Sequence, residues 1–565
     1  MHDVNLLPNI NRVWTTILIE CLKNHQIKTF FTSPGLRNAP ILSAISALET
    51  AKVHSGIDER SMAFRALGYS KFTGSPGVLV CTSGTAMANY LPAVIEAYQT
   101  NIPLIIISAD RPKELVELGD NQSIIQNNIF GDYLRGQLLL DTPNIKIEPQ
   151  EFYDKLSRFL NGDKPAGPLH INFPFSEPLD LTTDTTPSEY KNKLNYLKDK
   201  RTYDKTKIEF ELPKIDKSKK TLLVVGAVPE YEDKSQIKSF INESGLPCFL
   251  DIGSGLKFSD IDSNKILPSF EHPEIRTLLE QNKPEVIIHL GGRLVSKHYY
   301  SFLKKTPELE VLLVGNEGQY THPAQNPTWK INAPISNFCK KAIETSYIQN
   351  RTPYTFDCKH VVGQKEDIID NSPFSFPSIS KRIVELLPEG SNLYLGNSTS
   401  IRSFDAFAST KTHAKNIKVF SHRGASGIEG FNASALGLAE VSDGPTVLVH
   451  GDIGFLHDMG SLLMYKNLKL PLINIIVNNK GGGIFRHLPI ANDSVTLPLI
   501  TTEHDMEFEK LFDWLGLDYT LVDNISRLES AFGNALKKQS ICFIEATINQ
   551  DENMAVYERL KTLKL

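Results

Sequence analysis

The sequence has few cysteines, no excess of either charge and no long apolar run, and each absence excludes a class of protein. Its 565 residues include six cysteines, none in a Cys-x-x-Cys pair, which indicates reduced thiols of a cytoplasmic protein and not a disulfide framework or a zinc site. The formal net charge is −5, so there is no electrostatic footprint for nucleic acid.

Membrane insertion and secretion are not expected either. No apolar run approaches the roughly 20 residues that cross a bilayer. The start of the chain, MHDVNLLPNI, lacks the basic start and apolar core of a secretory signal. Hydrophobic residues make up 41% and charged residues 22% of the chain, as in ordinary soluble globular proteins. The length predicts three or so domains at roughly 150 residues each.

Strand-like and helix-like segments alternate in three blocks, 1–185, 219–345 and 378–565. Repeated units of this kind predict an α/β fold, with a mostly parallel sheet and helices on both of its faces in each domain. The polar segments 186–218 and 346–377 are interpreted as linkers. The first and third blocks have similar lengths and the same alternation, which hints at a duplication.

Two local signals concern the starts of helices. Asn11 is expected to cap a helix that contains Val13 and Ile17. The second block opens with Thr221–Glu230, which ends in the glycine turn VVGAVPE. This turn can be a nucleotide-binding loop or a plain strand–turn–helix connection. The full three-glycine spacing of a dinucleotide site is missing, which favours the plain connection.

The clearest chemical signal lies between Gly451 and Phe485. TVLVHGD is interpreted as a buried strand that ends at Asp452, and PLINIIVNN as the next strand, which ends at Asn479. A right-handed strand–helix–strand unit brings both ends to the same edge of a parallel sheet. Oxygen ligands beside a glycine-rich backbone at Gly481 suit Mg²⁺ shared with a diphosphate. The alternative is a Gly-Asp turn without a metal, which is common in α/β proteins.

Charged residues also follow strands of the first block. Glu59 lies in the motif IDER, and Asp110 and Arg111 lie in ADRP. A surface ion pair is the default interpretation of each. Their places at strand ends, where ligands bind in parallel sheets, favour a functional role.

These motifs together resemble a known family. The Gly-Asp and Asn-Asn pairs within 451–479 are similar to the diphosphate-binding signature of thiamine-diphosphate enzymes, and Glu59 matches their cofactor-activating glutamate. In this order, SPGLRNAP, ADRP, INFPFSEPL, RGASGIEG and NNKGGGIF resemble the 2-succinyl-5-enolpyruvyl-6-hydroxy-3-cyclohexene-1-carboxylate (SEPHCHC) synthases of menaquinone biosynthesis.

The resemblance implies a thiamine-diphosphate-binding fold of three domains. A pyrimidine-binding domain would occupy 1–185, a central domain without catalytic duty 219–345, and a diphosphate-binding domain 378–565. It also implies a homodimer, because in this superfamily the cofactor lies between the first domain of one subunit and the last domain of another. Glu59 would then face the Asp452 site of a second copy. Pairing of dimers into a tetramer stays open.

The implied activity is the decarboxylation of 2-oxoglutarate and the addition of the resulting succinyl carbanion to isochorismate. Thiamine diphosphate and Mg²⁺ are the implied cofactors, with Mn²⁺ as an alternative metal. The implied catalytic residue is Glu59, which would be protonated, with a raised pKa, in a partly apolar interface. The implied cofactor contacts are Glu59, Ser426, Ile428, Gly451, Asp452, Asn479 and Gly481. Asp452, Asn479 and the backbone carbonyl near Gly481 would hold the metal.

Both implied substrates are polyanions, which predicts several cations at fixed places. Ile484 and Phe485 would form an apolar wall near the reacting carbon, and Arg423 lies beside the family positions. The implied substrate contacts are Arg37, Arg111, Gln122, Lys297, Ser398, Arg402, Ile484 and Phe485.

Three positions depart from the family pattern. Leu36 replaces a polar serine, so a hydrogen bond to substrate or cofactor is expected to be missing. His298 follows Lys297 in place of an arginine, which weakens a carboxylate clamp unless His298 is protonated. Ile453 replaces a glycine at a place where only the backbone is needed.

Two alternatives to this function are open. One is a thiamine-diphosphate enzyme of the acetolactate synthase or 2-oxo acid decarboxylase type. The basic residues around ADRP, SK and NSTSIR favour polyanionic substrates over pyruvate. The other is a non-catalytic α/β protein that kept the fold. The joint presence of Glu59, Asp452 and Asn479 argues against it.

Overall fold

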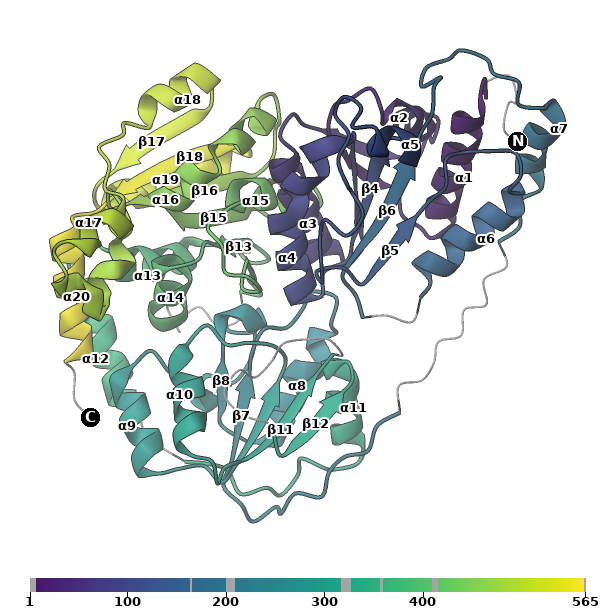
Figure 1. Ribbon diagram of the computed structural model, residues 1–565. Coiled ribbons are helices and arrows are strands. Elements are labelled where there is room, and N and C mark those ends of the chain that lie inside the picture. Colours follow the sequence, from purple (N-terminus) through teal and green to yellow (C-terminus); the bar gives the residue numbers. More distant parts are fainter. Residues whose placement is uncertain are drawn as a thin grey trace. The chain divides into compact units, whose positions relative to one another are not determined.

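The protein folds as three parallel sheets covered by helices (Figure 1). The described residues divide into two compact units, Met1–Lys207 with one sheet and Ile208–Leu565 with two. Each sheet has six strands, and the expected α/β fold class is confirmed. The computed structural model describes residues 7–162, 165–199, 209–316, 327–355, 359–408 and 415–562.

The first sheet has the strand order β2-β1-β3-β4-β6-β5. Interior strands β3 and β4 are buried along their whole length, as strands covered on both faces are. Helices α1, α2 and α6 pack on one face, and α3 and α4 lie on the other (Figure 1). The bounds are α1 Ile10–Asn24, β1 Thr29–Thr32, α2 Ala39–Ser46, β2 Lys52–Ser55, α3 Glu59–Thr73, β3 Gly77–Cys81, α4 Leu91–Thr100, β4 Leu104–Asp110, α5 Lys113–Glu117, β5 Gly136–Leu139, α6 Pro149–Leu160 and β6 Pro168–Pro174.

The second sheet has the order β12-β11-β10-β7-β8-β9, which is the order of doubly wound dinucleotide-binding sheets. Helices α8 and α11 cover one face, and α9 and α10 cover the other. The bounds are β7 Thr221–Val225, α8 Lys234–Ser244, β8 Cys248–Leu250, β9 Ile266–Leu267, α9 Pro273–Gln281, β10 Val286–Leu290, α10 Lys297–Lys305, β11 Glu310–Gly315, β12 Trp329–Asn332 and α11 Ile335–Glu344.

The glycine turn after β7 is closed by neighbouring backbone. A Cβ added at Gly226 would lie 2.0 Å from the carbonyl oxygen of Gly292, so only glycine fits. The Gly226 N–H donates to the carbonyl of Leu290, and the Ala227 N–H donates to that of Arg293. Since these N–H groups bond within the protein, they do not point at a phosphate. The structure supports the plain strand–turn–helix interpretation.

The third sheet has the order β14-β13-β15-β16-β18-β17. Counted from the first strand of each domain, this order is the same as in the first sheet, which supports the hint of a duplication. Helices α13, α14 and α19 pack on one face, and α15, α16 and α18 lie on the other. The bounds are α12 Lys359–Asp370, α13 Phe376–Leu386, β13 Asn392–Leu395, α14 Thr399–Phe407, β14 Lys418–Ser421, α15 Phe431–Ala439, β15 Thr446–Gly451, α16 Asp452–His457, β16 Leu472–Asn478, α17 Thr496–Thr501, α18 Glu509–Leu515, β17 Asp518–Val522, α19 Ile525–Lys538, β18 Cys542–Thr547 and α20 Gln550–Lys561.

Both segments expected to be linkers contain helices. In the first, α7 (Ser188–Asn192) is followed by a 3₁₀ turn, and Tyr190 and Leu194 are buried in the core of the first sheet. The second contains α12, whose Ile369 packs against α20. Polar composition hid these helices because each contributes only one or two apolar side chains. The parts 200–208 and 356–358 lie outside the described residues.

Membrane and cysteine expectations can be compared with the described part of the chain. No helix there is long and apolar enough to cross a membrane. The five cysteines that it contains are buried and form no disulfide there. Cys358 lies outside the described residues.

The first helix begins earlier than its sequence signal predicts. The N-cap of α1 is Asn9 and not Asn11, and its side-chain oxygen accepts a hydrogen bond from the Arg12 N–H. The Asn9 amide group also donates to the carbonyls of Asp180 (3.0 Å) and Thr182 (2.9 Å). Asn11 lies inside the helix, where its amide group donates to two carbonyls of the segment after β6. Tertiary contacts therefore select the cap.

Replacing Asn9 should destabilise α1 more than loss of an ordinary cap does. Asn524 caps α19 in the same way but is exposed, so Asn524→Ala should cost about 1 kcal/mol. Asn9→Ala also leaves two carbonyls without their donor and should cost about 3 kcal/mol. Hydrogen exchange of the α1 and α19 amides measures both losses. Equal losses would contradict the tertiary role of Asn9.

Candidate active site

The predicted metal and diphosphate residues lie at the carboxyl edge of the third sheet. β13 pairs with β14 on one side and with β15 on the other, so the strand order reverses here, where ligands bind in open α/β sheets. Ser398 follows β13 and Asp452 follows β15. The two strand ends are close, because a Cβ added at Gly396 would lie 2.5 Å from the Cβ of His450.

Asp452 is a buried carboxylate that two backbone N–H groups hold. It begins α16 and is 1% exposed. Oδ1 accepts from the Ile453 N–H and Oδ2 from the Gly481 N–H, each at 2.8 Å. Burial raises the pKa of Asp452, and these N–H groups act in the opposite direction. The replacement of a family glycine by Ile453 is therefore compatible with the site, because only its backbone contacts the carboxylate.

The loop after β16 brings its backbone against two side-chain amides. Gly481 has φ +142°, and a Cβ there would lie 2.8 Å from the carbonyl oxygen of Thr501. A Cβ at Gly483 would lie 2.0 Å from Nδ2 of Asn479. The Asn479 amide group donates to Oε1 of Gln550 at 2.9 Å. Both glycines are therefore needed for this close approach.

The Gly481 carbonyl, expected as a metal ligand, already has a partner. It accepts a hydrogen bond from the Gly483 N–H at 2.9 Å. The contact of Gly481 with Asp452 is made by its N–H group. A carbonyl oxygen has a second lone pair, so this bond leaves one position for a ligand.

Two further residues of this site, His504 and Gln550, are missing from the residues predicted from the sequence. His504 places Nε2 3.2 Å from Oδ2 of Asp452. The Gln550 Nε2 atom is buried and has no hydrogen-bond partner among the described residues. Gln550 comes three residues after the last strand, at the carboxyl edge where ligands bind, and that position could have identified it. His504 lies in the loop segment TTEHD, which has no motif.

A cavity of about 590 Å³ opens beside these residues. The cavity is lined by the backbone of the glycine loop and by side chains of both charges. These include Lys480 and the Arg486–Glu503 ion pair, whose atoms are 2.8 Å apart. The lining residues are Asn479, Lys480, Gly481, Gly482, Gly483, Arg486, Thr501, Glu503, His504, Asp505, Ile548, Asn549 and Gln550.

The loop that carries Ser426 and Ile428 lies against the same edge. The Asn397 amide group donates to the carbonyl of Gly427 at 2.6 Å, which ties this loop to the end of β13. A Cβ at Gly454 of α16 would lie 3.6 Å from the Ile428 carbonyl oxygen. The Ile428 side chain is 40% exposed, and Ser426 has φ +61°. The loop thus presents an apolar side chain near Asp452.

Basic side chains gather around the start of α14. Ser398 is the N-cap of this helix with φ +67°, an uncommon value for a residue other than glycine. Arg402 donates from Nη1 to the Ser398 carbonyl at 2.8 Å, and Arg423 donates from Nη1 to Oδ1 of Asn397 at 3.3 Å. The structure therefore brings two predicted substrate-binding residues, Ser398 and Arg402, close to Arg423.

Ile484 and Phe485 lie in a short 3₁₀ helix, Gly483–His487, directly after the glycine loop. Both side chains are half-buried. A Cβ at Gly482 would lie 3.1 Å from the Phe485 ring. The two side chains thus form an apolar border next to the cavity.

Lys297 belongs to the second sheet domain, where it begins α10 and is exposed. Ser296 caps this helix by accepting from the His298 N–H at 3.3 Å. Burial, Arg276 and Lys297 lower the pKa of His298 to about 4, so the imidazole is neutral near pH 7. A carboxylate clamp that needs protonated His298 does not operate at that pH.

In the first unit, Glu59 begins α3 and is half-buried. Asp58 is the N-cap and accepts from the Ser61 N–H at 3.2 Å. Burial raises the pKa of Glu59, a backbone hydrogen bond acts in the opposite direction, and Asp58 raises it further. Its carboxyl group therefore keeps a proton at higher pH than an ordinary glutamate does.

Two other predicted residues of the first unit, Arg111 and Gln122, meet at Ser83, and a third, Arg37, bonds to the Phe175 carbonyl at 2.9 Å. Arg111 donates from Nη1 to the Ser83 hydroxyl, and Gln122 donates from Nε2 to the Ser83 carbonyl at 3.0 Å. Burial and the nearby Arg111 charge lower the pKa of Arg37. Neighbouring guanidinium groups favour a nearby anion, and the exposed carboxylates of Glu177 (3.5 Å from Arg37) and Asp120 (3.7 Å from Arg111) pair with them. Leu36 beside them is 71% exposed and offers no hydrogen bond. Ser83 lies in the motif TSGT, where no role was assigned to it.

Comparison with known proteins identifies the family. The model of the N-terminal TPP-binding domain of thiamine pyrophosphate enzymes matches residues 13–133. The model of the middle domain of thiamine pyrophosphate matches residues 189–395, and that of the C-terminal TPP-binding domain matches residues 408–546. The SEPHCHC synthase of Syntrophus aciditrophicus is 34% identical, over 99% of this chain and 100% of its own. The chain belongs to the SEPHCHC synthase family.

A second SEPHCHC synthase, from Chlorobium phaeovibrioides, is 32% identical over 98% of this chain and 97% of its own. The expected thiamine-diphosphate cofactor and the transferase class are confirmed by these matches. Among solved structures, the benzoylformate decarboxylase of Polynucleobacter necessarius has a TM-score of 0.67 and 15% identity, and the match covers 95% of this chain and 98% of that one. The 4-hydroxybenzoylformate decarboxylase of Rhodococcus jostii RHA1 has a TM-score of 0.68 and 16% identity, with 96% and 100% covered. These likenesses show the fold.

The third sheet domain has the features that a diphosphate and its metal require. A Cβ at Gly481 or Gly483 would collide with neighbouring atoms, so glycine keeps the backbone accessible to a ligand. Among the described residues, Nε2 of Gln550 has no hydrogen-bond partner, so it can donate to a phosphate oxygen. The described residues contain no group of three or more His, Cys, Asp or Glu that could hold a metal ion. Asp452 and Asn479 supply one carboxylate and one amide, a set that suits Mg²⁺ when phosphate and water oxygens complete its coordination.

Gly483→Ala should weaken the binding of thiamine diphosphate with Mg²⁺ about tenfold or more, because the new methyl group displaces Asn479 from Gln550. Gly533→Ala is the matched control. Nothing lies within 4 Å of a Cβ at Gly533 inside α19, so helix stability should rise by up to about 1 kcal/mol with unchanged cofactor affinity. Isothermal titration calorimetry measures both affinities. Unchanged affinity of the Gly483 variant would contradict this role of the loop.

Proposed function

We propose that the protein catalyses the thiamine-diphosphate- and Mg²⁺-dependent decarboxylation of 2-oxoglutarate with addition of the succinyl unit to isochorismate. The products are SEPHCHC and CO₂, in menaquinone biosynthesis. Beside the full-length likeness to SEPHCHC synthases, the observation that carries the proposal is a pair of neighbouring arginines: Arg111, which bonds to the Ser83 hydroxyl, and Arg37, whose pKa the Arg111 charge lowers. Adjacent guanidinium groups suit a polyanionic substrate, whereas pyruvate with a small acceptor has no need of them.

Asp452, Asn479 and the backbone at Gly481 hold the metal and the diphosphate in this proposal. Mg²⁺ is the expected ion and Mn²⁺ the alternative. When bound, thiamine diphosphate supplies a thiazolium ring that accepts the electron pair left by decarboxylation. His504 orients Asp452, and Gln550 orients Asn479, through the contacts described above.

Glu59 is the proposed catalytic residue. Its pKa is raised, so the carboxyl group keeps a proton to higher pH than an ordinary glutamate does, and in the protonated form it can donate a hydrogen bond to the aminopyrimidine ring of the cofactor. We place Glu59 of one copy opposite Asp452 of another in a homodimer. Dimers that pair into tetramers are the alternative assembly.

The remaining predicted residues contact the cofactor rings and the substrates. Ile428 would pack against the rings of the cofactor, and Ser426 would add a hydrogen bond to the cofactor. Cations bind the substrate carboxylates, neutral groups orient them, and apolar side chains border the reacting carbon. The proposed substrate contacts are Arg37, Arg111, Gln122, Lys297, Ser398, Arg402, Arg423, Ile484 and Phe485.

The deciding experiment combines purified protein with thiamine diphosphate, Mg²⁺, 2-oxoglutarate and isochorismate. Isochorismate absorbance should fall only when all components are present, and chelation of the metal should stop the reaction until Mg²⁺ is restored. CO₂ release from pyruvate without consumption of isochorismate would favour an enzyme of the acetolactate synthase or 2-oxo acid decarboxylase type.

Glu59→Gln should slow exchange of the thiazolium C2 proton of bound cofactor by about a hundredfold or more, while cofactor binding persists. The amide cannot give up a proton as the carboxyl group can. Glu151→Gln is the control, since Glu151 also lies in the first turn of a helix but is exposed. Deuterium exchange followed by NMR after an acid quench measures the rate. Normal exchange in the Glu59 variant would remove this residue from the proposal.

A further inference from the structure

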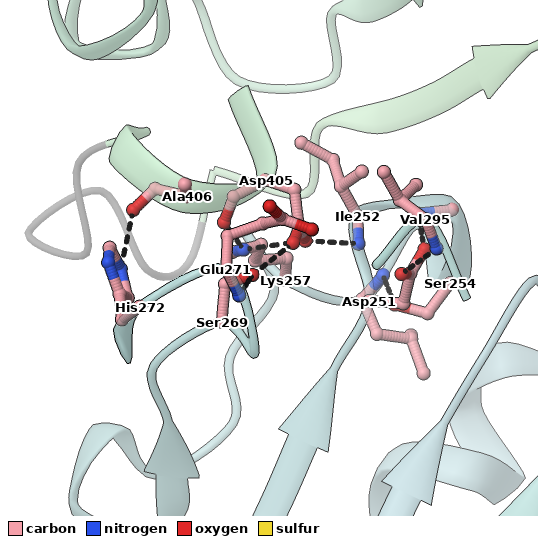
Figure 2. Close-up of polar contacts among 12 residues, drawn as sticks. Asp251, Ile252, Ser254, Lys257, Ser269, Glu271, His272, Val295, Asp405 and Ala406 are labelled. Carbon is pink, nitrogen blue, oxygen red and sulfur yellow. Dashed lines mark hydrogen bonds and ion pairs between the residues drawn. The ribbon is translucent and has the colours of Figure 1, made fainter. Parts of the chain in front are cut away.

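Three acidic side chains lie where the second and third sheet domains meet within the second unit. We call Asp251, Glu271 and Asp405 the boundary cluster. Figure 2 shows the helix that carries Asp405 over the loops of the second sheet domain. Asp251 and Asp405 are 5% and 4% exposed. Buried carboxylates are costly unless they are bonded, so the partners of each side chain indicate what the cluster does.

Asp405 ties α14 to the second sheet domain. Its Oδ1 atom accepts from the Ile252 N–H and from Nζ of Lys257, each at 3.1 Å. Its Oδ2 atom accepts from the Ser269 hydroxyl, and its backbone carbonyl accepts a second bond from Lys257. These donors all belong to the other domain (Figure 2). The same helix begins at Ser398 and carries Arg402.

Asp251 holds the loop that leads to Lys297. Its Oδ2 atom accepts from the Val295 N–H at 2.6 Å, and its Oδ1 atom accepts from the Gly253 N–H at 2.8 Å. Val295 lies two residues before Lys297. Asp251 also directly precedes Ile252, whose N–H bonds to Asp405. The two carboxylates thus act on one short backbone segment from opposite sides.

Glu271 lies close to both cationic positions, Lys297 and Arg402. Its Oε2 atom lies 3.9 Å from Nε2 of His298, which directly follows Lys297, and Ser296 and Arg402 are close enough to lower the pKa of Glu271. Burial raises the pKa of Glu271, whereas Ser296, Arg402 and Arg276 act in the opposite direction. Its carboxylate therefore lies between the start of α10 and the side of α14.

Apolar packing makes this boundary rigid. Ile252, Phe258 and Val295 of the second sheet domain are buried in the hydrophobic core of the third. A core shared in this way behaves as a packed interior and not as a sliding surface. The boundary cluster therefore lies beside apolar contacts that join the two domains.

We propose that the boundary cluster is a positioning device that fixes Lys297 of one domain relative to Ser398 and Arg402 of the other. This inference rests on the proposed function, in which these residues bind substrate carboxylates. Two cations clamp a polyanion only at a matching separation, and small misplacements reduce catalysis strongly. The second sheet domain then shapes the substrate site without touching the cofactor.

The test uses Asp405→Asn and Glu271→Gln in the full-length protein. Both substitutions keep the side-chain shape and remove one charge. Asp260→Asn is the control, because Asp260 pairs with Lys238 at 2.6 Å on the exposed surface of the same domain. We expect the KM of at least one substrate to rise about fivefold or more in each cluster variant. Cofactor affinity, C2 proton exchange and the control should change by less than about twofold.

Hydrogen exchange supplies a readout that does not depend on the reaction. Asp405→Asn should increase exchange in the segment 293–300, which belongs to the other domain, whereas Asp260→Asn should not. Asp405→Glu, which keeps the charge, should recover part of the wild-type KM. A lowered kcat with both KM values unchanged, or unchanged exchange in 293–300, would overturn the proposal. Wild-type protein that fails to consume isochorismate would instead contradict the proposed function, and the exchange result would still decide the positioning role.

Discussion

The buried carboxylate of Asp452 is the constraint on which the carboxyl edge of the third sheet depends. A carboxylate in this position needs donors around it, because burial disfavours its charged form. Those donors are backbone N–H groups of its own helix and of Gly481, so β15 and β16 must be neighbours and the loop after β16 must turn back. The left-handed backbone at Gly481 and the close packing at Gly483 follow from that turn. The side-chain amides of Asn479 and Gln550 then form a hydrogen bond beside these glycines.

The second sheet domain has the topology of a dinucleotide-binding sheet, but the residues at its ligand-binding positions make contacts within the protein. Its strand order is that of dinucleotide-binding sheets, in which an acid near the second strand commonly binds a ribose. Here the turn at Gly226 is filled by backbone. Asp251, at the end of the second strand β8, bonds to Val295 instead of a ligand. Topology alone therefore says little about what such a domain binds.

The sequence predicted the parts of the site that follow from strand ends. Asp452 and Asn479 could be placed because apolar runs mark buried strands, and parallel strands present their carboxyl ends at one edge. His504 could not, since it acts through a tertiary contact with a residue far along the chain and lies in a segment without a motif. Gln550 could have been found only from its position after the last strand, because its partner Asn479 is also far along the chain. The same reason explains the cap of α1. Asn9 and Asn11 carry the same local signal, and carbonyls after β6 decide between them.

The first and third sheets share one strand order, yet their corresponding loops carry different chemistry. The loop after the third strand holds Asp452 in one sheet and Ser83 in the other. The loop after the second strand holds Glu59 in the first sheet and Ile428 in the third. One sheet therefore cannot stand in for the other, because Glu59 and Asp452 lie on different sheets and after strands that do not correspond.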